Sequence, residues 1–174
     1  VVLFGIALLL LARFVPPPSP MDSAADIAQL YAEHSVGIIA GAMLSMSASG
    51  LYVLWSALSG VLMLRMQPAS PVLAYAQMLA GSTIIFIVAI PCMLWVTASF
   101  RADRSPEVIY AINDFAFLIF IGIFSTAFIQ YLTFGLAILA DRSAPLLFPR
   151  WMGYFSLWVA STTLPASIMP FFKS

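Results

Sequence analysis

Few side chains in this sequence are able to carry out acid–base, nucleophilic or redox chemistry. His34 is the only histidine and Cys92 the only cysteine among 174 residues. A single thiol excludes an internal disulfide and a cysteine framework for zinc or an iron–sulfur cluster. A single histidine excludes a haem held by two histidines of one chain. Neither a Gly-x-Ser-x-Gly elbow nor a phosphate-binding loop occurs. The sequence therefore favours a protein that is not an enzyme, and we expect no cofactor.

Several of the remaining polar side chains form one polar cluster at the ends of expected helices. Its members are Asp26, Glu33, His34, Arg101, Arg104, Asn113 and Asp114. One interpretation is an access point for a proton or a cation. The interpretation that we favour is structural, with Arg101 or Arg104 paired to Asp114, because an ionised carboxylate at membrane depth is costly without a partner. One histidine with two flexible carboxylates is weak support for a zinc site, so we expect no bound metal.

Two amides, Gln77 and Gln130, lie inside otherwise apolar stretches. They either line a pocket for a small hydrophobic molecule or form hydrogen bonds between helices, and we favour the second use because it is common in membrane proteins. Pro91 and Pro165 interrupt predicted helices, and in transporters such broken helices lie near the binding pocket. These four residues are therefore the candidate pocket lining.

The elements that carry these residues are long apolar segments. Of all residues, 63% are hydrophobic and 8% are charged, whereas ordinary soluble domains carry about 25% charged residues. The sequence therefore predicts an integral membrane protein surrounded by lipids. The formal net charge of +0 leaves no basic surface for nucleic acid, which we exclude as a partner.

We predict a single all-α domain over residues 1–174, a polytopic membrane helix bundle with five visible transmembrane helices. The spans are predicted at about 1–15, 34–66, 72–99, 108–140 and 151–172, and a short amphipathic interfacial helix at about 23–34. Apolar sequence stands at both ends of the chain, so we expect a fragment of a six-helix protein. Placing the two short turns in the cytoplasm favours a cytoplasmic N-terminus.

The second predicted span carries small residues at every fourth position: Gly37, Gly41, Ser45 and Ser49. Residues four apart lie on one face of a helix. In lipid, a face without bulky side chains allows another helix to approach closely. We therefore predict that this small-residue face packs against another helix.

One stretch resembles known sequences. Phe148-Pro149-Arg150-Trp151-Met152-Gly153-Tyr154, together with the Arg-Ser-Pro-Glu turn at 104–107, is similar to stretches of uncharacterised bacterial multi-pass inner-membrane proteins. The resemblance implies a bacterial cytoplasmic membrane as the location and implies no activity.

Two functions fit these features. The leading hypothesis is a non-enzymatic accessory or scaffold subunit of a bacterial membrane complex, or a self-associating bundle, whose partners are other transmembrane subunits or a second copy. A small-residue face and an aromatic stripe along the fourth span favour it. The alternative is a carrier or binding protein for a small hydrophobic molecule or lipid.

Overall fold

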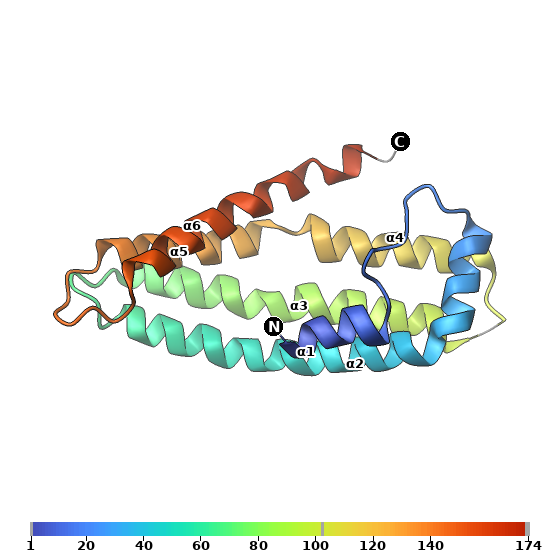
Figure 1. Ribbon diagram of the computed structural model, residues 1–174, viewed down its shortest axis with the longest axis horizontal. Coiled ribbons are helices and arrows are strands. Elements are labelled where there is room, and N and C mark those ends of the chain that lie inside the picture. Colours follow the sequence, from blue (N-terminus) through green and yellow to red (C-terminus); the bar gives the residue numbers. More distant parts are fainter. Residues whose placement is uncertain (1, 102, 173–174) are drawn as a thin grey trace. The chain divides into compact units, whose positions relative to one another are not determined.

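The computed structural model describes residues 2–101 and 103–172, and over these residues the protein consists of helices and connecting segments without strands (Figure 1). Helices make up 79% of the structure. Three segments are long and apolar enough to cross a membrane, Ala24–Met63, Pro71–Phe100 and Pro106–Ala140. The prediction of an all-α protein is confirmed, and the lengths and compositions of these three segments are compatible with a membrane protein.

The helices follow one another with short connections. They are α1 (Val2–Gly5), the π-helix η1 (Ile6–Leu11), α2 (Ala24–Met63), α3 (Pro71–Phe100), α4 (Pro106–Gly122), α5 (Ser125–Ala140), α6 (Arg150–Thr163) and the 3₁₀ turns η2 (Leu164–Ser167) and η3 (Met169–Phe171). Together, α4 and α5 form the third long segment.

The first and fifth predicted spans correspond to shorter helices. In the N-terminal region, α1 and η1 end at Leu11. At the other end, α6 has 14 residues, about 21 Å at 1.5 Å per residue, against a hydrocarbon layer of roughly 30 Å. It gives way to η2 at Leu164 because Pro165 has no N–H to continue the helical hydrogen bonds. Three of the five predicted spans thus have the length to cross a bilayer as long helical segments.

Reciprocal hydrogen bonds between Ser23 and Asp26 stabilise the start of α2. The Ser23 hydroxyl donates to Asp26 Oδ2 at 2.6 Å, and the Asp26 N–H donates to Ser23 Oγ at 3.3 Å. This exchange satisfies backbone donors that the first helical turn leaves free. Further along, α2 bends at His34, where φ is −117° and ψ is 15°. The bend falls where the sequence separated an interfacial helix from the second span.

Packing divides the chain into two compact units. Unit 1 consists of Val1–Gly50, Phe86–Gly122 and Met169–Ser174, and unit 2 consists of Leu51–Ile85 and Ile123–Ile168. The boundaries fall inside α2 and α3, so each of these helices contributes residues to both units. The sequence had assigned one domain to residues 1–174, and in the structure each unit has its own core.

The core of unit 1 is aromatic. Phe14, in the segment after η1, has its ring centroid 5.0 Å from that of Trp95 in α3 and 5.4 Å from that of Phe117 in α4. Tyr31 of α2 lies beside the same Phe14 ring, at 6.1 Å. Phe14, Tyr31 and Trp95 are buried. Because aromatic pairs bury large areas, this cluster fastens the N-terminal segment to three helices.

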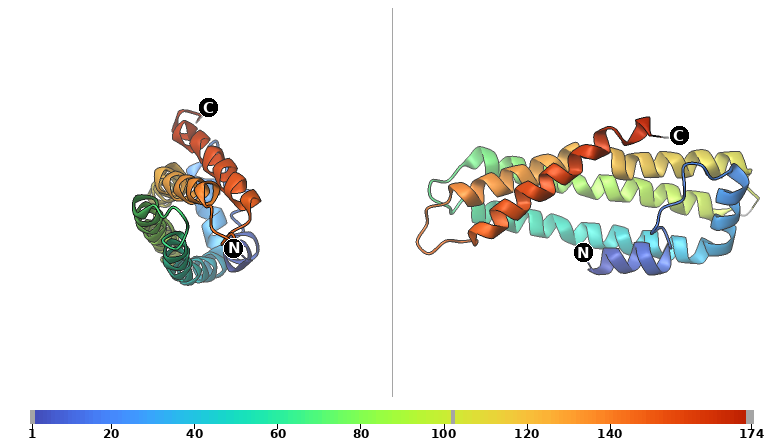
Figure 2. Two further views of the ribbon diagram at one scale, coloured as in Figure 1. Left: turned by 90° about the vertical axis from the view of Figure 1, so that its left-hand side faces the viewer. Right: turned by 45° about the horizontal axis from the view of Figure 1, so that its top comes forward.

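The core of unit 2 lies where the ends of α2 and α3 meet α5. Its buried members are Met63, Met66, Ala74, Phe134, Ala137 and Ile138. Figure 2 shows α5 and α6 side by side. Their close contact depends on two glycines, since a Cβ at Gly135 would lie 2.9 Å from the carbonyl oxygen of Gly153. Larger residues at these positions would force the two helices apart.

Candidate functional site

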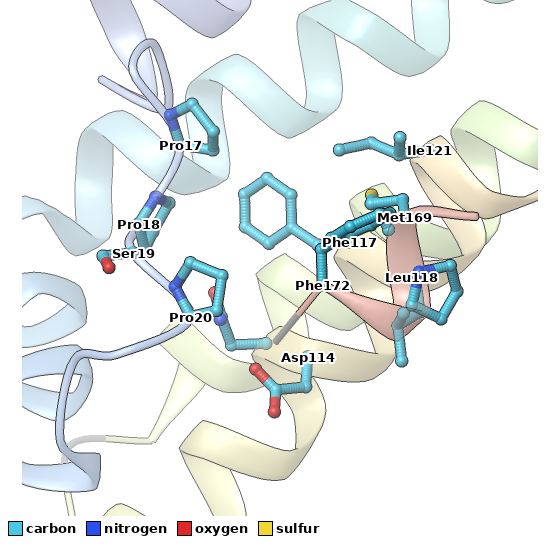
Figure 3. A pocket seen from close by; sticks show the side chains of 12 residues that line it. Pro17, Pro18, Ser19, Pro20, Asp114, Phe117, Leu118, Ile121, Met169 and Phe172 are labelled. Carbon is cyan, nitrogen blue, oxygen red and sulfur yellow. The ribbon is translucent and has the colours of Figure 1, made fainter. Parts of the chain in front are cut away.

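A cavity of about 310 Å³ in unit 1 is the candidate functional site. Figure 3 shows its walls: the proline-rich segment before α2, one face of α4, and the chain from Met169 to Phe172. Pro17, Pro18 and Pro20 line the first wall. Ligand pockets in proteins measure roughly 300–1,000 Å³, so the cavity suits a small ligand.

The α4 wall combines apolar and polar side chains. Its lining residues are Asn113, Asp114, Phe117, Leu118 and Ile121. These positions form two adjacent rows, because residues four apart lie above one another on a helix. Among the described residues that line the cavity, Asp114 is the only one with a charge. The cavity is therefore an apolar space with one carboxylate in its wall.

A buried hydrogen bond holds the polar end of this wall. The Tyr31 hydroxyl of α2 donates to Asn113 Oδ1 at 3.0 Å, and both residues are buried. Tyr31 also packs against Phe14 in the aromatic core. Since Asn113 directly precedes Asp114, this bond fixes the turn of α4 that carries the carboxylate.

The predicted ion pair of Asp114 is absent from the part of the chain that the structure describes. Neither Arg101 nor Arg104 pairs with Asp114, and the Arg101 side chain is exposed. Both arginines precede the start of α4 at Pro106. Asp114 lies about 12 Å further along the helix axis, at 1.5 Å per residue. The structure thus places Asn113 and Asp114 together and leaves the two arginines outside the site.

The other acidic members of the polar cluster serve α2 itself. Asp26 caps the helix start through Ser23, as described above. Glu33 accepts a hydrogen bond from Gln29 Nε2 at 2.8 Å, one turn away. No group of three histidine, cysteine, aspartate or glutamate side chains suited to a metal ion occurs among the described residues. These carboxylates therefore stabilise a helix and do not form a shared site with Asp114.

His34 contacts the N-terminal segment. Its Nδ1 lies 3.2 Å from the Leu30 carbonyl oxygen, and its Nε2 lies 3.2 Å from Arg13 Nη1. A carbonyl oxygen only accepts hydrogen bonds and a guanidinium only donates them. Both contacts are hydrogen bonds in the tautomer that carries its proton on Nδ1. Arg13, whose φ is 54°, lines a second cavity of about 430 Å³ with Glu33 and His34.

The small-residue face of α2 lies partly against the N-terminal segment. A Cβ at Gly41 would lie 2.6 Å from the Ala7 carbonyl oxygen, and one at Gly37 would meet the Leu11 carbonyl oxygen. Ser45 and Ser49 are both buried. The Ser49 hydroxyl donates to the Met46 carbonyl oxygen at 2.7 Å. At the two glycines, the neighbour is the backbone of η1, together with Ala12 just after it at Gly41.

The four predicted pocket-lining residues do not line either cavity. Gln77 and Gln130 are buried in unit 2, where Gln77 Nε2 donates to Ser59 Oγ at 2.9 Å and the Tyr52 hydroxyl donates to Gln130 Oε1 at 2.8 Å. Both bonds join helices. Gln77 Oε1 and Gln130 Nε2 have no partner among the described residues. Pro91 is buried inside α3, which continues through it, and Pro165 follows the end of α6.

The sequence did not single out Asp141, which is buried in the α5–α6 loop of unit 2. Its Oδ1 accepts hydrogen bonds from the Gln67 N–H at 3.1 Å, the Ser143 N–H at 2.9 Å and the Ser143 hydroxyl at 2.5 Å. Burial by itself raises the pKa of Asp141, but the hydrogen bonds from Ser143 and Gln67 outweigh it and hold the pKa below its ordinary value. Arg150 caps the same loop by donating to the Leu139 and Asp141 carbonyl oxygens.

Comparison with known proteins adds no assignment. No family model matches the chain, and no curated protein or solved structure matches it.

Proposed function

We propose that the protein is a non-enzymatic integral membrane protein that binds a small hydrophobic molecule or lipid in the cavity of unit 1. The observation that carries this proposal is the cavity itself, with a volume of about 310 Å³ and mostly apolar walls. Burying apolar surface contributes roughly 25 cal/mol per Å². Prolines, Phe117, Leu118 and Ile121 supply that surface.

In more detail, the proposal places the protein in a bacterial cytoplasmic membrane, with five membrane spans and its N-terminus in the cytoplasm. The three long apolar helices support a membrane location. Support for further membrane-embedded helices comes from the exposed apolar side chains of the short ones, such as Leu10 of η1 and Trp158 of α6. Because such side chains are costly in water, lipid is their expected surrounding.

The test combines ligand extraction with blocking of the cavity. Protein purified in mild detergent is extracted, and bound hydrophobic molecules are quantified by mass spectrometry. Leu118→Trp fills the cavity and should remove a stoichiometric ligand. Val108→Trp is the matched control, because Val108 and Leu118 are both on α4 and both 45% exposed, and Val108 is not a lining residue. Equal ligand content in both variants would refute the proposal.

A second candidate, the accessory or scaffold subunit, is favoured by the outer face of α6. Trp151, Tyr154, Phe155 and Trp158 are all exposed and spaced three or four apart along one face. Aromatic side chains of this kind form the centres of many protein interfaces. Mass measurement in mild detergent tests this candidate, since a monodisperse monomer without a co-purifying protein would exclude it.

A further inference from the structure

We propose that the ligand of the unit 1 cavity carries a protonated amine on a small hydrophobic body, and that Asp114 binds this amine. The proposal rests on the proposed function and adds the chemical class of the ligand. It follows from the charge of the cavity, the position of Asp114 on α4 and the aromatic ring beside it.

The charge of the cavity selects the sign of the ligand. Asp114 is the only charged side chain among the described residues that line it, and the other walls consist mainly of proline and apolar side chains. A carboxylate in such surroundings attracts a cation more strongly than one in bulk water, because the local dielectric constant is lower. A fatty acid or another anion would be repelled by the same carboxylate.

The fold supplies little compensation for this carboxylate. Asp114 lies beyond the first turns of α4, which begins at Pro106, and the favourable field of a helix N-terminus fades within the first turn. Arg101 and Arg104 do not pair with it in the described structure. A carboxylate without a counter-charge is costly at an apolar site. A cationic ligand would remove that cost when it binds.

The surroundings of Asp114 also suit an ammonium group. The Tyr31–Asn113 hydrogen bond, 3.0 Å long, holds the helical turn that carries Asp114, so little ordering is required on binding. Phe117 lies one turn further along the same wall, and an aromatic ring near a carboxylate is a second attractive partner for a cation. With a volume of about 310 Å³, the cavity suits an aromatic or short alkyl body attached to the amine.

The experiment measures the affinities of two matched probes for the full chain in lipid nanodiscs at neutral pH. One probe is 2-phenylethylamine, which is protonated at this pH, and the other is 2-phenylethanol, its neutral analogue of nearly the same size. We expect Asp114→Asn to weaken binding of the amine by about 10- to 100-fold, the range for a hydrogen bond to a charged group. Binding of the alcohol should be almost unchanged.

Two further variants separate the role of Asp114 from general effects. Asp114→Glu keeps the carboxylate and should retain the preference for the amine. Glu107→Gln removes an exposed negative charge from the first turn of the same helix and should leave both affinities unchanged. Thermal unfolding without ligand shows whether each variant is folded. If Glu107→Gln reduces the preference for the amine over the alcohol as much as Asp114→Asn does, the proposal is wrong.

The outcomes distinguish this proposal from the proposed function. If both probes bind to the wild type with equal affinity and Asp114→Asn changes neither, the cavity binds hydrophobic molecules and the amine proposal is wrong. If neither probe binds and no hydrophobic molecule is extracted, the proposed function fails as well. Nanodiscs with ethanolamine-headed lipids distinguish the source of the amine. If these lipids compete with the amine probe, the ligand is a lipid headgroup. If they do not compete, the ligand is a free amine.

Discussion

Replacing Asp141 should destabilise unit 2 more than the loss of any exposed carboxylate. Its Oδ1 joins two connections that are distant in sequence, because it accepts from the Gln67 N–H after α2 and from Ser143 after α5. A second bond runs the other way, from the Arg142 N–H to the Gln67 carbonyl oxygen at 2.6 Å. Asp141→Asn keeps an oxygen acceptor but removes the charge that strengthens three hydrogen bonds.

The magnitude follows from those three bonds. A hydrogen bond to a charged group contributes about 1.5–3 kcal/mol, and one between neutral groups about 0.5–1.5 kcal/mol. The difference is about 1 kcal/mol per bond, reduced here because water reaches the partly exposed Ser143. We expect Asp141→Asn to cost about 2 kcal/mol and Asp141→Ala about 3 kcal/mol, since alanine also leaves the Gln67 N–H without an acceptor. For a chain of this size, 2 kcal/mol lowers the Tm by about 4–8 °C.

The assay is thermal unfolding in mild detergent, followed by tryptophan fluorescence, with Asp103→Asn as the control because Asp103 is an exposed loop carboxylate. The folded state holds the pKa of Asp141 below its ordinary value. The stabilisation is therefore complete above the unfolded pKa of about 3.9 and is lost as the pH falls through the lower folded pKa. The Tm difference between wild type and Asp141→Asn should shrink over that acidic range. The reasoning would be refuted if Asp141→Asn lowered the Tm no more than Asp103→Asn does, or if the Tm difference between wild type and Asp141→Asn did not change with pH.

Two further predictions concern buried contacts. Gly41→Leu should cost about 1–3 kcal/mol through overpacking against the Ala7 carbonyl oxygen, and it should expose the N-terminal segment to limited proteolysis. Gly50→Leu is the control and should have little effect, because no neighbouring atom lies within 4 Å of a Cβ at Gly50. Equal protease sensitivity of the two variants would contradict this prediction. Tyr52→Phe and Gln130→Leu should each lower the Tm, because each change removes the partner of the other polar group, the buried Gln130 amide or the half-buried Tyr52 hydroxyl. The double variant should lose less than the sum of the two losses, and additive losses would argue against the bond.

The parts of the fold that were predictable are those that depend on local sequence. Uninterrupted apolar stretches between charged or proline-containing turns identified the three long helical segments. A helix start was predicted at about residue 23, next to the observed start of α2 at Ala24, and the hydrogen bonds between Ser23 and Asp26 that cap it span only three residues. Pro165 was recognised as an interruption of the fifth predicted span, but the span was still predicted to reach about residue 172, whereas α6 ends at Thr163 and η2 begins at Leu164. Helix length is thus less predictable than helix position.

The site was less predictable because it depends on contacts between distant residues. Asn113 and Asp114 were selected as polar residues in an apolar span, a local signal, but their neighbours Pro17 and Met169 come from remote parts of the chain. The suggested arginine partners were chosen for their proximity in sequence. Each residue of a helix advances about 1.5 Å along the helix axis. Arginines before the start of α4 are therefore far from Asp114 in space, although they are near it in the sequence.

The proline-rich segment before α2 contributes both through its local conformation and through its contact with distant parts of the chain. Proline lacks an N–H and has a fixed φ, and both properties prevent a helix from continuing through such a segment. The same two properties determine what it contributes as a cavity wall. Its fixed backbone makes Pro17, Pro18 and Pro20 a preformed apolar surface, and the missing N–H groups prevent these residues from donating hydrogen bonds to a ligand. Polar recognition therefore falls largely to the α4 wall, where Asp114 supplies the charge and the Tyr31 hydroxyl holds the adjacent Asn113.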